Sequence, residues 1–456
     1  MYNKFYFLGI GGIGMSAIAR YFKAKGFAVA GYDRTRSQLC CELETEGIDI
    51  HYTPDTEQIA APYRDATTTL VVYTPAIPTE HVELVWFREN GFEVEKRAQV
   101  LGHITETERG LCVAGTHGKT TISIMAAHLL KQSHVDCNAF LGGISKNYTS
   151  NLLLSDHSDL VVIEADEFDR SFHHLRPYMA VISAVDADHL DIYGTYEAYL
   201  KSFEHFTSLI RPGGCLIMKK GLALQPRLQA KVQLYTYSAT EPADFYAENV
   251  RINCGSIVFD FVVPDGIRIK DIALGVPVPI NVENGVAAMA LAWLNGATPD
   301  EIRHGMASYS GIRRRFDIHL KTDRLTIIDD YAHHPKEIEA SIKSVKAIYA
   351  GKKVLGVFQP HLYTRTRDFY REFAAALSHL DEVILVELYP AREQPIEGIS
   401  SATIYDWVTC TKTLTTKAQL IDVLRSKHFD VLLTLGAGDL DTMVDEICKE
   451  LTQSKI

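Results

Sequence analysis

The feature that most restricts the fold of this chain is a phosphate-binding loop set between an apolar strand and a helix. The run Leu111–Ala114 leads directly into Gly115-Thr116-His117-Gly118-Lys119-Thr120-Thr121, and Thr120–Gln132 has helical periodicity. The amides of such a turn cradle phosphates, the lysine meets the β and γ oxygens, and a threonine offers its hydroxyl to Mg²⁺. The loop is a shortened variant, because Val113 stands where the full pattern has its first glycine. A chance Gly-Lys-Thr turn is the alternative, but the strand–loop–helix context predicts an α/β domain that binds phosphates.

A second glycine-rich turn lies close to the N-terminus. The apolar run Lys4–Leu8 leads into Gly9-Ile10-Gly11-Gly12-Ile13-Gly14, and the next expected strand, Ala28–Tyr32, ends at Asp33. Small residues let a diphosphate approach the N–H groups at the start of a helix, and an acid after the second strand can hold a ribose hydroxyl. An unliganded tight turn is the alternative, and nothing in the pattern selects nicotinamide. We expect a nucleotide that carries a diphosphate.

The same uncharged N-terminal run has a superficial likeness to a signal peptide. Its glycines would break an apolar helix, so a strand and a turn explain the spacing better. The eight cysteines are scattered and none forms a C-x-x-C pair, which favours a reducing compartment. The longest uncharged stretch, Asn284–Pro299, is shorter than the roughly 18–20 residues that a membrane helix needs. We therefore expect a cytoplasmic protein without membrane insertion.

Acidic residues and a histidine follow two further apolar strands. Leu160–Ile163 runs into Glu164-Ala165-Asp166-Glu167, and Met179–Ser183 runs into a segment that contains His189. Parallel strands deliver such side chains to the carboxyl edge of a sheet, beside a phosphate loop, where hard divalent cations bind. An acidic surface turn and a structural histidine are the alternatives. We predict that Glu164 and His189 are metal ligands.

The last third of the chain contains two polar clusters that each follow an apolar strand, Asp329–Pro335 and Phe358–Asp368. Both are expected at the carboxyl edge of a sheet, where open α/β folds bind their ligands. Arg365 and Arg367 are suited to an anion, and the alternative is exposed charge at a helix start. The run Arg313-Arg314-Arg315 is either solvated or a phosphate clamp.

Strands that alternate with helices predict an α/β fold with parallel sheets. A length of 456 residues allows two to four domains, and the pattern indicates three, at 1–107, 108–311 and 312–456. From about residue 216 to 278 the pattern alternates as in an antiparallel annex. Lys and Arg number 46 against 57 Asp and Glu, a net charge of −11, which excludes a general nucleic-acid binder.

In their order along the chain, these motifs resemble those of the Mur ligases, and the likeness extends over nearly the whole sequence. The matching segments are the N-terminal glycine turn, Gly115–Thr121, Glu164–Asp169, Asp188-His189, Gly311–Phe316, Asp329–Pro335 and Phe358–Asp368. Within the family, the compact last two clusters are most similar to members that attach L-alanine, rather than a whole peptide, to UDP-N-acetylmuramate.

The resemblance implies N- and C-terminal Rossmann-like domains with parallel sheets, flanking a central P-loop ATPase α/β domain with an antiparallel annex. It implies UDP-N-acetylmuramate, L-alanine and ATP as substrates, an acyl phosphate as intermediate, and Mg²⁺ as the metal. We expect a monomer or a weak homodimer with no nucleic-acid partner.

The resemblance also implies the site residues. For the UDP-sugar they are Gly9, Gly11, Gly12, Gly14, Asp33, Thr74 and Ala76. For ATP they are Gly115, Thr116, His117, Gly118, Lys119, Thr120, Thr121, Asn281, Asn284, Arg315 and Asp330. For the amino acid they are Tyr331, His333, Arg365 and Arg367. The implied metal ligands are Thr120, Glu164 and His189, and the implied catalytic residues are Lys119, Arg315 and His333, the last as a base or to position alanine.

The chain departs from the family pattern at three places. Leu362 stands where many members carry an arginine, and Ile280 replaces a histidine before Asn281. Related ligases use a carbamylated lysine between metals, and Lys201 is near that position but offset. Other interpretations are a sister ligase that attaches a peptide, a nicotinamide-dependent oxidoreductase and a non-catalytic nucleotide-binding regulator. The last two leave the phosphate loop or the metal ligands unexplained.

Overall fold

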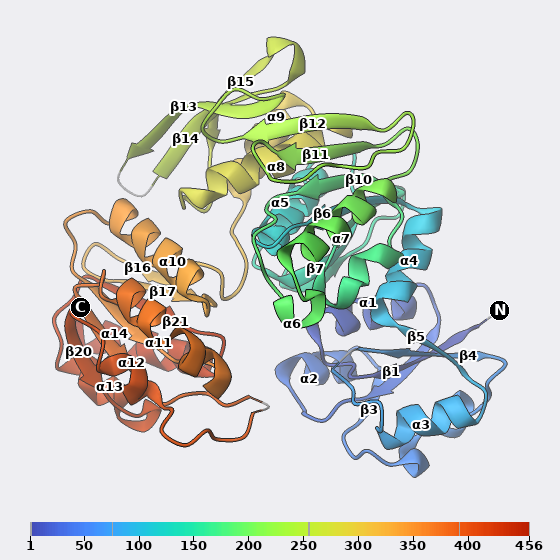
Figure 1. Cartoon of the computed structure of the whole chain (residues 1–456), viewed down its shortest axis with the longest axis horizontal. Helices are drawn as coiled ribbons and strands as arrows, with labels where there is room; N and C mark the ends of the chain where they lie inside the picture. Colours follow the sequence, from blue (N-terminus) through green and yellow to red (C-terminus); the bar gives the residue numbers. More distant parts are fainter. Residues whose placement is uncertain (1, 75, 254–255, 392, 456) are drawn as a thin grey trace. The chain divides into compact units, whose positions relative to one another are not determined.

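The structure, a computed structural model, describes residues 2–74, 76–253, 256–391 and 393–455. They form an α/β protein with sheets of five, ten and six strands, one for each expected domain, which confirms the predicted fold class (Figure 1). The chain divides into two compact units. The first consists of Met1–Val250, Phe259–Gly275 and Asn281–Ser310, and the second of Arg251–Val258, Val276–Ile280 and Gly311–Ile456. The domain boundaries near 107 and 311 stay a prediction.

The N-terminal sheet is parallel throughout, in the order β3-β2-β1-β4-β5. Its strands are β1 (Lys4–Leu8), β2 (Ala28–Tyr32), β3 (Asp49–His51), β4 (Thr69–Tyr73) and β5 (Glu93–Lys96), and its helices are α1 (Ile13–Ala24), α2 (Gln38–Thr45), α3 (Val82–Glu89) and α4 (Arg97–Thr107). Because alternate residues of a strand point to opposite faces, Phe5 and Phe7 enter one core while Tyr6 and Leu8 enter another. Both faces are therefore buried, as in other parallel sheets.

The central sheet has the order β15-β14-β13-β12-β11-β10-β6-β9-β7-β8. Its strands are β6 (Arg109–Ala114), β7 (Asn138–Ser145), β8 (Ser150–Leu153), β9 (Leu160–Glu164), β10 (Pro177–Ile182), β11 (Cys215–Lys219), β12 (Gln233–Ser238), β13 (Phe245–Asn253), β14 (Ser256–Val262) and β15 (Arg268–Ala273). Its helices are α5 (Lys119–Lys131), α6 (Leu190–Tyr193), α7 (Tyr196–Ser208), α8 (Ile280–Leu294) and α9 (Pro299–Ser308). Around β6 the strands run parallel, so the phosphate loop leaves the carboxyl edge of the sheet.

The predicted antiparallel annex is only partly correct. β11 pairs parallel with β10, β12 with β11 and β13 with β12, so this segment begins by extending the parallel sheet. Neighbouring strands β13 and β14 are separated by two residues, a distance that only antiparallel strands can span. The sequence pattern failed here because the β11–β12 and β12–β13 connections, residues 220–232 and 239–244, contain no helix to mark a parallel crossover.

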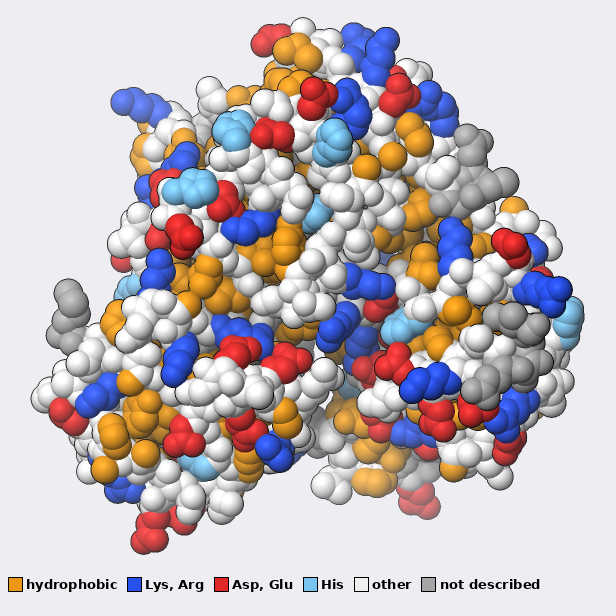
Figure 2. All heavy atoms as spheres, turned by 180° about the vertical axis from the view of Figure 1, so that it is seen from behind, with side chains coloured by type: hydrophobic (Ala, Val, Ile, Leu, Met, Phe, Trp, Pro, Cys, Tyr) orange, Lys and Arg blue, Asp and Glu red, His pale blue; other side chains and the backbone are white. Residues whose placement is uncertain are grey.

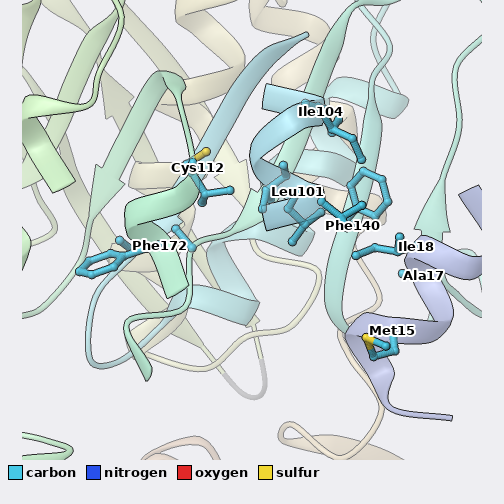
Figure 3. Close-up of a cluster of buried hydrophobic side chains, with 14 of the residues drawn as sticks. Met15, Ala17, Ile18, Leu101, Ile104, Cys112, Phe140 and Phe172 are labelled. Atoms are coloured by element: carbon cyan, nitrogen blue, oxygen red, sulfur yellow. The ribbon is translucent and has the colours of Figure 1, made fainter. Parts of the chain in front are cut away.

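One hydrophobic core joins the N-terminal sheet to the central sheet within the first unit. Figure 3 shows its side chains converging from α1, α4, β6, β7 and the 3₁₀ helix η3 (Phe168–His174). Gly102 lets α4 approach η3, since a Cβ there would lie 2.6 Å from the His174 carbonyl oxygen. The two glycine-rich turns are therefore held in one packed body.

The C-terminal sheet has the order β16-β17-β21-β18-β19-β20. Its strands are β16 (Asp317–Lys321), β17 (Thr326–Asp330), β18 (Val354–Phe358), β19 (Glu382–Leu385), β20 (Thr411–Leu414) and β21 (Val431–Leu435), and its helices are α10 (Pro335–Ile348), α11 (Tyr363–Leu377), α12 (Ser401–Tyr405), α13 (Lys417–Arg425) and α14 (Val444–Lys455). The sheet is parallel except at its edge, where β16 pairs antiparallel with β17. Both predicted polar clusters follow strands at its carboxyl edge.

Charged side chains of both signs are interspersed over the face drawn in Figure 2. The full sequence has a net charge of −11. Among the residues that the structure describes, no helix has the length and hydrophobicity needed to cross a bilayer.

Candidate active site

The phosphate loop spans residues 115–118, between the end of β6 and the start of α5. Gly115 and Gly118 have φ of 134° and 83°, in the left-handed region that favours glycine. A Cβ at Gly115 would lie 2.3 Å from Oγ of Ser183, and one at Gly118 would lie 2.8 Å from Oδ1 of Asn284. Both glycines are therefore required by close approach as well as by backbone conformation.

The rest of the loop is anchored to the segment that follows β10. Thr116 donates its N–H to the Ala184 carbonyl and its hydroxyl to the Asp186 carbonyl, both at 3.0 Å. The His117 carbonyl accepts the hydroxyl of Ser183. Thr121 lies in the first turn of α5. These contacts fix the loop before any nucleotide binds.

Lys119 is held by a buried carboxylate. Its Nζ donates to Oε1 of Glu167 at 2.8 Å and to the Gly115 carbonyl at 2.9 Å, and Glu167 is 1% exposed. Burial alone would lower the pKa of Lys119, but the carboxylates of Glu167 and Glu164 keep it above its usual value. The ammonium is therefore charged and aimed at the loop.

The predicted metal ligands Thr120 and Glu164 lie together. The Thr120 hydroxyl donates to the two carboxylate oxygens of Glu164 at 3.1 and 3.0 Å. Gly142 of β7 makes room for this carboxylate, because a Cβ there would lie 1.7 Å from Oε2 of Glu164. A hydroxyl and a carboxylate beside a phosphate loop are the hard oxygen donors that suit Mg²⁺, which takes its other ligands from phosphates and water.

His189, the third predicted ligand, lies close to the same group of charges. Its Nε2 is 3.9 Å from Oε1 of Glu167 and 3.8 Å from Oδ2 of Asp188. No group of three or more His, Cys, Asp or Glu side chains within the described ranges forms a metal site by itself.

The two predicted adenine-side asparagines come from the first turns of α8. Asn281 and Asn284 are both 7% exposed, and Nδ2 of Asn284 donates to Oδ1 of Asn281 at 3.2 Å. Because Oδ1 of Asn284 lies against Gly118, this pair is next to the phosphate loop. Ile280, which replaces the family's histidine, is exposed.

The N-terminal glycine turn brings together most of the residues predicted for the UDP-sugar. Gly9 has φ of 83°, and a Cβ there would lie 2.8 Å from Cγ2 of Thr74. Gly11 donates its N–H to Oδ2 of Asp33 at 2.8 Å, while Oδ1 of Asp33 accepts from the N–H of Thr35. Asp33, expected to hold a ribose hydroxyl, therefore also shapes the turn.

The remaining predicted residues surround this turn. Gly12 is the N-cap of α1, and Gly14 lies in the first turn of that helix. A Cβ at Gly14 would lie 2.4 Å from Nη1 of Arg97, a residue that the sequence analysis did not single out. Ala76 is exposed in the turn that follows β4.

In the second unit, Arg315 lies beside the end of β17. Its neighbours Arg314 and Phe316 have φ of 63° and 45°, so the backbone turns sharply on both sides. Nη2 of Arg314 donates a hydrogen bond to the carbonyl oxygen of Gly436 at 3.1 Å. The guanidinium of Arg315 lies 5.8 Å from the ring centroid of Tyr331. Arg314 thus supports the segment that presents Arg315.

Asp330, the last residue of β17, is oriented by two donors. The hydroxyl of Ser341 donates to Oδ2 at 2.6 Å, and the N–H of Ala332 donates to Oδ1 at 3.3 Å. Burial raises the pKa of this carboxyl. The side chain is held in one position at the carboxyl edge of the sheet, where a ribose hydroxyl is expected.

His333 is a neutral imidazole in a polar setting. Its Nδ1 lies 3.0 Å from the Tyr331 carbonyl oxygen and 3.5 Å from Oε2 of Glu337. Burial lowers the pKa of His333 in spite of the carboxylate of Glu337. A neutral imidazole at pH 7 is able to accept a proton.

Arg365, the first of the two arginines predicted to bind the amino acid, lies beside a histidine. Its Nη1 is 3.4 Å from Nδ1 of His361, and the His361 ring stacks on Tyr389 with 5.8 Å between centroids. Arg367, predicted for the same pocket, donates to Oδ1 of its neighbour Asp368 at 2.7 Å and is half exposed. The structure therefore places Arg365 beside His361, whereas Arg367 pairs with Asp368.

Contributors to these sites that were missed by the sequence analysis, or not assigned a role in it, include Glu167, Gly142, His361 and Tyr389 as well as Arg97. Glu167 had a signal, since it belongs to the acidic block that begins at Glu164. His361 lies inside a recognised motif, directly after β18. Gly142 and Tyr389 had none, because each meets its partner through the tertiary fold alone.

Comparison with protein families matches the chain in three parts. The model described as "Mur ligase family, catalytic domain" matches residues 4–109, "Mur ligase middle domain" matches 113–292, and "Mur ligase, glutamate ligase domain" matches 314–438. A UDP-N-acetylmuramate–L-alanine ligase of Parabacteroides distasonis is 63% identical, covering 98% of this chain and 97% of its own. One of Phocaeicola vulgatus is 62% identical, covering 97% of each.

Solved structures show the same likeness. The crystal structure of the UDP-N-acetylmuramate–alanine ligase of Thermotoga maritima covers 99% of this chain and 100% of its own, with a TM-score of 0.83 and 26% identity. A murein peptide ligase of Psychrobacter arcticus covers 99% of each chain, with a TM-score of 0.69 and 19% identity, a likeness of fold alone.

Proposed function

The chain belongs to the Mur ligase family, and on that basis we propose that it joins L-alanine to the lactyl carboxylate of UDP-N-acetylmuramate in peptidoglycan biosynthesis, converting ATP to ADP and phosphate. The observation that carries the proposal is the 63% identity, over 98% of the chain, to a relative named for this reaction. The phosphate loop, the charged Lys119 and the neutral His333 supply the groups that such a reaction needs.

The chemistry follows from the poor reactivity of a carboxylate towards amines. Transfer of the γ-phosphoryl group of ATP to the carboxylate gives an acyl phosphate and ADP. The amine of L-alanine attacks the acyl carbon and loses a proton, and the tetrahedral intermediate expels phosphate. Lys119 and Arg315 are assigned to charge that develops on the transferring phosphoryl group. His333 is assigned to the proton of the amine, or to holding alanine in place.

The other site residues follow the same proposal. Thr120, Glu164 and His189 are assigned to Mg²⁺, which supplies positive charge beside the phosphates when bound. Asn281, Asn284 and Asp330 are assigned to the adenosine of ATP, and Arg365 to the carboxylate of L-alanine, with Tyr331 and His333 beside it. The N-terminal turn and its neighbours are assigned to the UDP-sugar. The corresponding domains are 1–107, 108–311 and 312–456.

We further infer that the protein works in the cytoplasm as a monomer or a weak homodimer. The described cysteines are free thiols, and several are fully buried, which suits a reducing compartment. ATP, the phosphoryl donor of the proposed reaction, is a metabolite of the cytoplasm.

The direct test is an assay of ADP release in three parallel reactions, with UDP-N-acetylmuramate plus L-alanine, plus a tripeptide, or without acceptor. We expect release and a product of the mass of UDP-N-acetylmuramoyl-L-alanine in the first reaction only. Lys119→Ala should lower kcat by about 10²–10³-fold while the UDP-sugar still binds. Lys220→Ala, which removes an ammonium paired with Glu241, serves as the control. Preference for the tripeptide, or full activity of Lys119→Ala, would contradict the assignment.

A further inference from the structure

The guanidinium of Arg97 lies directly on the N-terminal glycine turn. Arg97 is the first residue of α4, and its Nη1 and Cζ are 2.4 and 3.2 Å from the point where a Cβ on Gly14 would stand. Gly14 itself belongs to the first turn of α1. The absence of a side chain at Gly14 leaves the space that the guanidinium occupies at the start of that helix.

Two backbone donors at the same place are unused. Gly9 and Ile10 donate their N–H groups to the Tyr32 carbonyl, and Gly11 donates to Asp33. The N–H groups of Ile13 and Gly14, by contrast, have no acceptor among the described residues. They lie at the positive end of the α1 dipole, which favours an anion.

The guanidinium of Arg97 is itself left with little to bind. It makes no hydrogen bond to any described residue, and its one ion-pair contact, to Oδ2 of Asp166, is long at 3.7 Å. Arg20 of α1, which is half as exposed, donates to Glu46, Glu42 and Asn151. The neighbouring cation Lys96 donates to Asp169 at 2.6 Å. Of these three cations, Arg97 is the one whose guanidinium or ammonium makes no hydrogen bond to a described residue.

We propose that Arg97 binds an anionic group of the sugar nucleotide, either its diphosphate or its lactyl carboxylate, at the start of α1. This inference rests on the proposed function and adds a residue to its UDP-sugar site. A guanidinium offers a planar pair of donors that matches two oxygens of a phosphate or carboxylate. Asp166 competes for the same cation in the free protein, so the sugar nucleotide displaces that contact when it binds.

Calorimetric titration of the full nucleotide-free chain tests the proposal. Arg97→Ala should weaken binding of UDP-N-acetylmuramate at least tenfold, and Arg97→Lys should weaken it less, because lysine keeps the charge but not the paired donors. Lys96→Ala is the matched control, since it removes the same charge one residue away, and it should bind as the native protein does. Asp166→Asn should bind equally well or more tightly.

UDP-N-acetylglucosamine, which lacks the lactyl group, distinguishes the two anions. Equal weakening of both ligands by Arg97→Ala assigns the contact to the diphosphate, and weakening of UDP-N-acetylmuramate alone assigns it to the lactyl carboxylate. Unchanged affinity in Arg97→Ala, or equal weakening by Lys96→Ala or Asp166→Asn, would overturn the proposal. If Arg97→Ala does not fold, native affinity in Arg97→Lys or weakened affinity in Asp166→Asn decides against it. Failure of the native protein to bind UDP-N-acetylmuramate would instead refute the proposed function.

Discussion

At the scale of single residues, each unit has a candidate site residue whose charge state is set by burial and a nearby carboxylate. Lys119 stays charged because Glu167 lies 2.8 Å away, although burial favours the neutral amine. His333 stays neutral because burial outweighs the nearby carboxylate of Glu337. The first arrangement suits binding of phosphates, and the second suits acceptance of a proton from an amine.

Arg365→Ala tests the assignment of the amino-acid carboxylate. A hydrogen bond to a charged group contributes about 1.5–3 kcal/mol, so we expect the KM for L-alanine to rise about 10–100-fold while the KM for ATP changes little. Arg371→Ala on the same helix, whose guanidinium lies 4.5 Å from the ring centroid of Trp407, is the control. Steady-state kinetics with each substrate varied in turn provide the measurement, and an effect confined to ATP would contradict this placement.

At the scale of secondary-structure elements, neighbouring strands determine where the carboxylate beside the phosphate loop can stand. β7 pairs parallel with β9, the strand that delivers Glu164, and its antiparallel pairing with β8 shifts register between Phe140 and Ser145. Gly142 lies in this irregular stretch and faces the Glu164 carboxylate without a side chain between them. The strand thus leaves space for the carboxylate of Glu164 beside Thr120.

Gly142→Ala should separate activity from stability. The added Cβ would lie 1.7 Å from Oε2 of Glu164, so that flexible carboxylate moves away from Thr120 while the backbone, which is not left-handed at this position, accepts alanine. We expect turnover to fall at least about tenfold, the equivalent of 1.4 kcal/mol, with a melting temperature close to that of the native protein. Gly285→Ala, whose Cβ meets only the end of Met306 and Leu274, is the matched control. Native turnover in Gly142→Ala would show that Glu164 does not need its observed position.

A buried histidine on α5 connects three elements of the first unit. Nδ1 of His128 lies 2.9 Å from the Tyr148 hydroxyl, and Nε2 lies 3.0 Å from Oγ of Ser308. Burial lowers the pKa of His128 to about 4, while the unfolded chain has the ordinary value near 6.5. Between these values the unfolded chain binds more protons, so stability is present above pH 6.5 and falls as the pH drops towards 4.

The expected loss of unfolding free energy from this histidine is about 3 kcal/mol between pH 7 and pH 4. Because His128→Gln lacks the titrating group, its stability relative to the native protein should rise as the pH falls. Thermal unfolding of both proteins across this range provides the measurement. Parallel stability curves would show that His128 does not contribute to the pH dependence.

At the scale of the whole molecule, polar contacts reinforce the core that joins the first two sheets. Asn151 of β8 is fully buried, donates to the Ile13 carbonyl at 2.6 Å and to the Ser16 hydroxyl at 2.8 Å, and accepts from Arg20 at 2.6 Å. The central sheet therefore holds the first turns of α1, the helix that follows the N-terminal glycine turn. The two glycine-rich turns are positioned by one packed body within the first unit.

Most of the fold and the position of the glycine-rich loop were predictable because their signals are local. A strand, a glycine turn and a helix in succession predicted the loop at residues 115–118, and an apolar strand before an acid predicted Glu164. The parallel course of β11 and β12 was not predictable, since no helix separates them. Arg97 and Gly142 were not predictable either, because their roles arise only where distant segments meet, at Gly14 and at Glu164.

The central claim is that the chain activates the lactyl carboxylate by phosphorylation and then transfers it to L-alanine. The most direct measurement uses UDP-N-acetylmuramate labelled with ¹⁸O in both carboxylate oxygens, with mass analysis of the phosphate and of the peptide product. The account predicts one ¹⁸O atom in each phosphate released and one in the new amide carbonyl. Release of unlabelled phosphate together with ADP, or an amide that retains no label, would contradict the account.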